Sequence, residues 1–186
     1  LGKFYAQVDL IDLGKETARL NKIDLSDTAI TLLMNDTTAK EDTTSTAVNW
    51  KLLLDEINLD RVSFAMQMPD DSLRLSTYID KAGLTEGSVD LGLARYSAAR
   101  FLLSGSSLGY DGSYGDPTPG FDPSHIALSN VNIKIDSLLY GGRDICAQIK
   151  EFSANDRSGL VLSSLTGNIR SDSTTIQVPG LLLKTP

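Results

Sequence analysis

The chain has very few of the residues that carry most enzyme chemistry. Its 186 residues include one cysteine, Cys146, and one histidine, His125. A single cysteine excludes an internal disulfide, and its apolar neighbours predict a buried structural thiol. A single histidine excludes a site built from several histidines, and a Ser-His-Asp arrangement would have to use His125. Because His125 precedes a strand-like segment, we expect it to be a polar residue at the strand entry.

Long apolar runs and positive charge are also scarce. No window approaches the roughly 18 consecutive apolar residues of a membrane-spanning helix, and no basic segment leads into an apolar stretch. With 17 Lys plus Arg against 24 Asp plus Glu, the net charge is −7. Nucleic-acid partners are not expected, because phosphate backbones are bound by clustered Lys and Arg. The length suits one domain, which in compact form would bury roughly 70% of the unfolded surface.

Alternation of apolar and polar residues with period two is the dominant pattern, and stripes of helical period are not convincing. It is clearest in two sets of alternate residues, Val62, Phe64, Met66 and Met68, and Val131, Ile133 and Ile135. Two segments interrupt it. The polar, Thr-rich segment 35–49 and the Gly-, Ser- and Pro-rich segment 104–125 are predicted to be flexible loops.

A strand-like phrase occurs twice, as IDLSDTAITLLMND in 23–36 and as INLDRVSFAMQMPD in 57–70, so that the second copy starts 34 positions after the first. A shorter phrase, Leu-x-x-Ile/Val-x-Leu/Ile, begins at Leu20, Leu54 and Leu128, with a degraded form at Leu162. Self-similarity at this interval is typical of stacked supersecondary units. We expect units of about three short strands, with chance similarity between β-rich segments as the alternative.

Candidate catalytic and metal-binding groups are weak. Asp111, Asp116 and Asp122 lie in the Gly-rich segment and could hold a hard cation, but their spacing fits no known calcium loop. Solvated turn residues are the better interpretation. The pair Asp55-Glu56 could do acid–base work only with shifted pKa values, and adjacent acids in a strand point to opposite faces. We therefore expect no catalytic residue, metal or cofactor, and no enzyme.

Several long segments resemble one known family. They are NWKLLLDEINLDRVSFAMQMPDDSLRLSTYIDKAGLTEGSVDLGLARYSAARFLL, GFDPSHIALSNVNIKIDSLLY and RSGLVLSSLTGNI. Together they make nearly the whole chain similar to the periplasmic portion of TamB-type translocation and assembly module proteins, in the form found in Bacteroidetes. This family belongs to the AsmA-like superfamily. The phrases carry no catalytic signature, so the resemblance concerns fold and general role.

The resemblance implies an envelope protein that is anchored in the inner membrane and crosses the periplasm. Its sheet would curl into an open β-taco with an apolar interior, associated with moving phospholipid to the outer membrane or with protein translocation and assembly there. An outer-membrane β-barrel partner would bind through other parts of such a protein. Because the chain begins without Met and ends after a strand-like run, we interpret residues 1–186 as a fragment of the trough.

The predicted fold is all-β: an elongated curled sheet, like an open β-solenoid, made of repeated short antiparallel strands with little helix. The predicted function is a non-enzymatic periplasmic conduit whose hydrophobic groove holds phospholipid acyl chains. The predicted lining consists of Ile23, Leu25, Ile30, Leu32, Ile57, Leu59, Val62, Phe64, Met66, Val131, Ile133 and Ile135. The alternatives are a scaffold that pairs with strands of barrel proteins through a sheet edge, and a polysaccharide-binding β-solenoid with exposed aromatics in a row.

Overall fold

The computed structural model describes residues 2–34, 48–68, 72–113, 115–142, 144–171 and 174–186. Within these ranges all regular structure is β-strand, which confirms the prediction of an all-β fold. The strands are β1 (Lys3–Asp12), β2 (Thr17–Leu33), β3 (Lys51–Met68), β4 (Leu73–Asp90), β5 (Arg95–Asp111), β6 (His125–Gly141), β7 (Asp144–Asp156), β8 (Val161–Leu162), β9 (Ser164–Ser171), β10 (Ile176–Gln177) and β11 (Leu182–Lys184).

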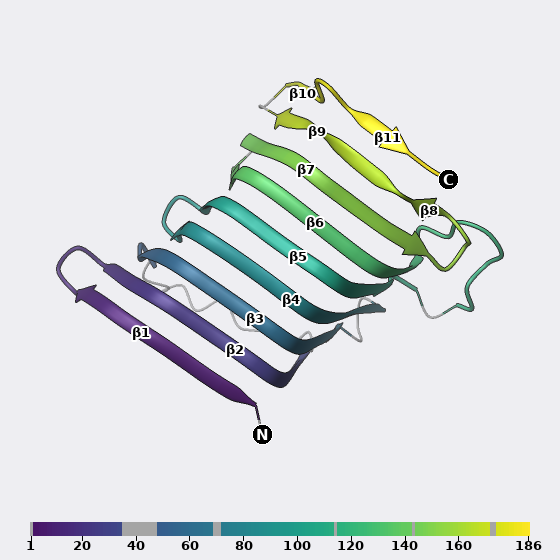
Figure 1. The fold of residues 1–186 in the computed structure, drawn as a ribbon. Coiled ribbons are helices and arrows are strands. Elements are labelled where there is room, and N and C mark those ends of the chain that lie inside the picture. The colour runs from purple at the N-terminus through teal and green to yellow at the C-terminus, as the bar shows by residue number, and fades with distance from the viewer. Residues whose placement is uncertain (1, 35–47, 69–71, 114, 143, 172–173) are drawn as a thin grey trace.

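The strands form one sheet that does not close on itself (Figure 1). They lie side by side in chain order from β1 to β7, followed by β9 and β10, while β8 pairs with the end of β7 and β11 with the start of β9. Strand β1 is at one edge, where β2 is its neighbour in the sheet. The sheet curls into an open trough, as the resemblance implied.

The strands differ from the prediction in length and in direction. Strands β2 to β6 have 17 or 18 residues each, so each one crosses the whole width of the trough. The pair β2–β3 is parallel, whereas the other neighbouring pairs are antiparallel. Antiparallel neighbours can be joined by a short hairpin turn, whereas parallel neighbours need a longer connection.

The spacing between the two similar phrases is the register of this parallel pair. Ile23 lies opposite Ile57, Leu25 opposite Leu59, and Leu32 opposite Met66, so every partner is 34 positions further along the chain. The two phrases therefore stack directly on one another. The similar phrase at Leu128 does not continue the stack, because β6 runs antiparallel to β5 and its Leu128 lies opposite Leu108. The predicted repeat is thus limited to β2 and β3.

The long strands bend at two places, and the bends of neighbouring strands line up. The first line, crease 1, contains residues with positive φ in β2, β3, β5 and β6: Asp27 (52°), Arg61 (52°), Gly105 (59°) and Asn130 (50°). The second line, crease 2, contains Glu86 (51°) in β4 and Ser137 (58°) in β6. Left-handed backbone inside a strand is a feature of bulges, which bend a strand sharply. The creases divide the sheet into a narrow floor and two walls.

A common sequence pattern marks these bends. At each one, two residues that are mostly polar stand between two that are mostly apolar, as in Leu59-Asp60-Arg61-Val62. The phrase that begins at Leu20, Leu54 and Leu128 is one form of this pattern. An interval of three residues would normally move the apolar side chain to the opposite face of a strand. The extra residue at the bend keeps it on the same face.

The sheet is a single layer, and few side chains are buried. The buried apolar residues of the described chain are Ala18, Val62, Ala98, Val131 and Ala154. The accessible surface of the chain is 12294 Å², against about 8,700 Å² for a compact protein of this mass. The chain is therefore more open than a compact protein of its size, because there is no second layer of described strands to cover either face of the sheet.

The two predicted loops have different outcomes. Nearly all of segment 35–49 lies outside the described residues. Segment 104–125 is shorter than expected, because β5 continues to Asp111 and the irregular part begins at Gly112. Its strand portion was hidden by Ser104-Gly105-Ser106-Ser107, which looks like a loop but forms crease 1 in β5. Leu108 and Tyr110 then resume the alternation.

Candidate functional site

Apolar side chains line one face of the sheet in rows that cross the strands. The register places Ile23, Ile57, Leu84 and Phe101 side by side, and the same row continues through Ile135 and Ile149. Next to it runs a row of Leu25, Leu59, Ala82, Leu103, Ile133 and Phe152. Neighbouring residues in register share a face. These two rows form the floor of the trough.

The rows of the walls are apolar as well. Beyond crease 2, Leu20, Leu54, Gly87, Ala98 and Leu138 form one row. Beyond crease 1, one row contains Ile30, Phe64, Thr77, Leu108 and Leu128, and another Leu32, Met66, Leu75, Tyr110 and Ile126. In the wall beyond crease 2, Tyr96 and Tyr140 also stack with ring centroids 6.0 Å apart. The apolar surface therefore runs across both creases.

Polar contacts on the opposite face show that both residues at a bend point away from the apolar rows. Asp55 accepts a hydrogen bond from Arg19 Nη2 at 3.2 Å, while the next residue, Glu56, pairs with Lys22 at 3.8 Å. At crease 1, Arg61 contacts both Asp27 and its own neighbour Asp60. In β3, consecutive residues thus share the polar face at both bends, and the residues that flank them share the apolar face.

Burial identifies the apolar side as the concave one. Immediately after crease 1, Val62 and Val131 are each 3% exposed and Ser106 is 1% exposed. The side chains of Asp27 and Arg61, at the same bend on the polar face, are about half exposed (46% and 49%). A bend crowds the side chains on its inner side and spreads those on its outer side. Ala98, 4% exposed beside crease 2, shows that this bend curls the same way.

The structure brings the predicted lining residues together. All twelve lie on the concave apolar face, from Ile23 and Leu25 in β2 to Ile133 and Ile135 in β6. The sequence prediction lacked the contributions of β4, β5 and β7, among them Leu84, Phe101 and Phe152. Their signal was weaker because glycine, alanine and threonine interrupt the alternation in those strands. The role of these residues in holding lipid stays a prediction.

The trough is long enough for an acyl chain. The creases cross the strands, so its axis runs perpendicular to them. Strands β1 to β7 are separated by six spacings of about 4.8 Å, which gives a length of about 29 Å. This is close to the roughly 30 Å thickness of the hydrocarbon core of a bilayer, to which each leaflet contributes about half. A single phospholipid chain would therefore fit along the floor.

The convex face carries the ion pairs that fix the bend at crease 1. Arg61 donates two hydrogen bonds to Asp27, from Nε to Oδ1 at 2.7 Å and from Nη2 to Oδ2 at 3.0 Å. The hydrogen bonding from Arg61 lowers the pKa of the Asp27 carboxyl below its ordinary value. Asp27 and Arg61 follow directly after residues that are paired in β2 and β3, so the register that aligns the apolar rows also aligns this pair.

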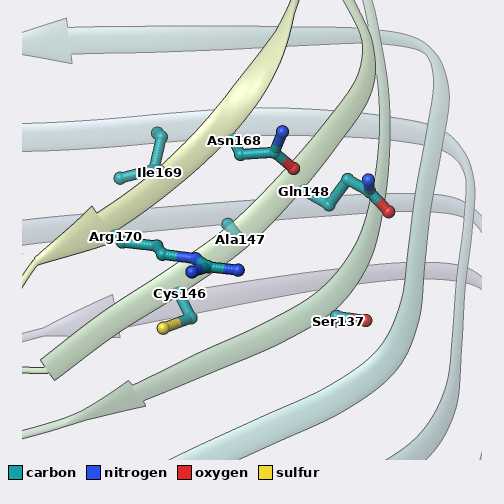
Figure 2. Close-up of a pocket in the computed structure, with 7 residues that line it drawn as sticks. All are labelled: Ser137, Cys146, Ala147, Gln148, Asn168, Ile169 and Arg170. Atoms are coloured by element: carbon teal, nitrogen blue, oxygen red, sulfur yellow. The ribbon is translucent and has the colours of Figure 1, made fainter. Parts of the chain in front are cut away.

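The sheet also has two smaller hollows. One, of about 190 Å³, lies near crease 2 and is lined by Ser137, Cys146, Ala147, Gln148, Asn168, Ile169 and Arg170 (Figure 2). The other, of about 310 Å³, extends over β2 to β5 and is lined by residues of both faces, including Ile30, Phe64 and Thr77 of the concave wall. Cys146 is half-buried and lies opposite Arg170, so the prediction of an apolar, buried thiol is wrong.

His125 has a more specific environment than the sequence indicated. It is 6% exposed, and both of its ring nitrogens have partners: Nδ1 lies 3.0 Å from Asp111 Oδ1, and Nε2 lies 2.9 Å from Ser113 Oγ. As expected, His125 is the first residue of a strand, β6. No sequence pattern indicated these two partners, which become neighbours of His125 because β5 and β6 are paired at Asp111 and His125.

The three loop aspartates do not form a metal site. Asp122 accepts hydrogen bonds from the amide nitrogens of Thr118 (2.9 Å) and Ser124 (3.0 Å), and the one from Thr118 is the main reason why its pKa is lowered. Asp111 faces His125, and Asp116 is exposed. Among the described residues, no group of three or more His, Cys, Asp or Glu side chains could hold a metal ion.

Comparisons with known proteins leave the chain without an assigned family. No protein-family model matches it, and a search of curated proteins finds no match either. In the part of the chain that the structure describes, no helix is long and apolar enough to cross a membrane. The fold therefore defines only a class, a single-layer β-trough with an apolar inside and a polar outside.

Proposed function

We propose that this chain forms part of a periplasmic conduit that shelters phospholipid acyl chains on their way to the outer membrane. The observation that carries the proposal is the apolar face of the trough, which continues from the floor over both creases into the walls. Its two floor rows, from Ile23 to Ile149 and from Leu25 to Phe152, contain no charged residue. An apolar face of this extent on a water-exposed surface is typical of a site for lipids or other proteins.

The physical basis is the cost of exposing hydrocarbon to water. Each methylene that leaves an apolar environment costs about 0.8 kcal/mol, so an acyl chain with about 15 methylenes faces on the order of 12 kcal/mol. Contact with the floor and walls would offset much of this cost. Movement along the trough requires no covalent step, and methylene groups offer no directional contact, so selectivity for the acyl chain is expected to be weak.

The resemblance of the sequence to TamB-type proteins supports the same proposal independently of the geometry. It suggests the periplasm as the location, an inner-membrane anchor elsewhere in the full-length protein, and phospholipid as the cargo. The fold that the resemblance implied, an open curled sheet, is the one observed. A trough that is open along its length would let the polar headgroup stay in water while the chain lies inside.

Site-specific photo-crosslinking tests the proposal. A benzophenone amino acid placed at Phe101, on the floor, should form adducts with phospholipid when the protein is illuminated with vesicles or inside cells. The same group at Arg100, the adjacent residue on the convex face, is the matched control. Phospholipid adducts at position 101 that exceed those at position 100 severalfold support the conduit. Equal yields at the two positions would refute it.

The free edge of the sheet favours a second candidate, a scaffold for barrel assembly. Strand β1 pairs with β2 alone among the described strands, and its Phe4 is 71% exposed. An edge of this kind can accept an incoming strand through main-chain hydrogen bonds. In this case peptides that correspond to barrel strands would protect the β1 amides from hydrogen exchange, and phospholipid would not.

A further inference from the structure

Three side chains at the end of β5 and the start of β6 form a hydrogen-bonded chain that the conduit does not use. Asp111 contacts Nδ1 of His125 at 3.0 Å, and Nε2 of His125 contacts Ser113 Oγ at 2.9 Å. Carboxylate, imidazole and hydroxyl are therefore connected in the order that nucleophilic serine sites use on several unrelated folds. Such sites are recognised by geometry and not by position in the sequence.

For an ionised Asp111 and a neutral His125, the donors and acceptors available set the direction of both hydrogen bonds. An ionised carboxylate can only accept, so Nδ1 of a neutral His125 must carry the proton and donate it to Asp111. Nε2 then has a lone pair and accepts the hydroxyl proton of Ser113. This is the tautomer in which the imidazole can act as a general base towards the serine.

Other contacts hold the three groups in place. Arg157 Nη2 donates to the main-chain oxygen of His125 at 2.8 Å, and the His125 amide donates to the main-chain oxygen of Asp122 at 3.1 Å. The amide of Gly112, next to Ser113, donates to Ser124 O at 2.7 Å. The backbone around the imidazole is thus held by Arg157, just after β7, and by Gly112 and Asp122, between β5 and β6, as preorganised chemistry requires.

His125 is more deeply buried than the two groups that it contacts. His125 is 6% exposed, so little water competes for its nitrogens. The side chain of Asp111 is 50% exposed and Ser113 is half-buried, so both residues are partly open to solution. A hydrogen-bonded loop anchor would show the same distances, and the reactivity of Ser113 distinguishes the two roles.

We propose that Ser113 is a nucleophile for activated carboxylic esters, with His125 as its general base and Asp111 as the positioning residue. Ser113 Oγ forms a bond to the acyl carbon while its proton moves to His125 Nε2. The bond from the acyl carbon to the leaving oxygen then breaks, and the leaving alkoxide takes this proton. Water deacylates the serine by the same route, which releases the acid and restores the hydroxyl.

A fluorophosphonate probe tests the proposal on the whole chain. The Ser113 oxygen would displace fluoride from phosphorus, and peptide mass spectrometry would locate the adduct. A positioned general base contributes about 10² to 10⁴ in rate. Ser113 should therefore react at least about 100-fold faster than any other serine. p-Nitrophenyl butyrate should acylate the same residue.

Variants separate reactivity from folding, with circular dichroism as the check on structure. Ser113→Ala should abolish the adduct, His125→Gln should slow it at least about 100-fold, and Asp111→Asn should slow it and change its pH profile. Ser97→Ala, on the same strand as Asp111 and far from it in sequence, should leave the rate unchanged. Labelling of Ser113 no faster than other serines, or undiminished labelling in folded His125→Gln protein, would overturn the proposal.

Discussion

Polar substitutions in the wall beyond crease 1 should impair lipid binding with only a moderate loss of stability. Ile30 and Leu108 lie in the same row on the concave face and are 42% and 40% exposed. Full burial of such a side chain contributes about 1.5–3 kcal/mol. With about 60% of each buried, replacement by asparagine should lower the free energy of unfolding by about 1–2 kcal/mol per site. The same change in a closed core would cost more, because truncation alone costs about 2–5 kcal/mol there.

Relative to the total, the two substitutions are expected to weaken lipid binding more than they lower the free energy of unfolding. If the two amides remove apolar contact from two or three methylenes, at about 0.8 kcal/mol each, the dissociation constant of a fluorescent phospholipid should rise about 30-fold. Fluorescence titration of the Ile30→Asn, Leu108→Asn double variant measures this change. The matched control carries Ala29→Asn and Ser107→Asn, which lie on the same strands and face the other side. Equal weakening in both proteins, or none in the first, would refute the assignment of the concave face.

Two predictions concern the bend and the loop. Gly105→Ala should lower the free energy of unfolding by about 1–2 kcal/mol, since Gly105 has a φ of 59° and a Cβ would lie 3.3 Å from Asp80 Oδ2. Gly83→Ala, without positive φ and with its nearest atom at 3.9 Å, is the control and should be nearly neutral in urea titration. Because the pKa of Asp122 is lowered in the folded protein, its stabilising effect should be present near neutral pH and be lost as the pH falls below about 4. Asp122→Asn should remove this part of the acid dependence of the urea midpoint, and an unchanged dependence would contradict the assignment.

The class of fold and much of the concave face could be predicted from the sequence because period-two alternation is a local property. The spacing of Val62, Phe64 and Met66 alone predicts that they share one face, whereas only burial in the structure identifies that face as the concave one. The two similar phrases were also informative, because the spacing between them equals the register of β2 against β3. What it could not indicate is that the two strands are direct neighbours in parallel.

The sequence predictions were wrong or incomplete where the structure depends on bends in the strands and on pairing between distant parts of the chain. A residue with positive φ, such as Arg61, resets the alternation, and no single residue type marks it: aspartate, arginine, glutamate, glycine, asparagine and serine all occupy such positions. For this reason each of the long strands β2 to β6 looked like several short ones. The partners of His125 were missed because the pairing of β5 with β6 brings Asp111 and Ser113 to it.

Native mass spectrometry of the purified protein, followed by solvent extraction, tests the central claim most directly. Protein expressed in a cell with phospholipid membranes should retain phospholipid through purification in gentle conditions, and extraction should release it and return the mass to that of the bare chain. The Ile30→Asn, Leu108→Asn variant should retain much less than the Ala29→Asn, Ser107→Asn control. Protein that carries no lipid, even when phospholipid vesicles are added in excess, would contradict a trough built for acyl chains.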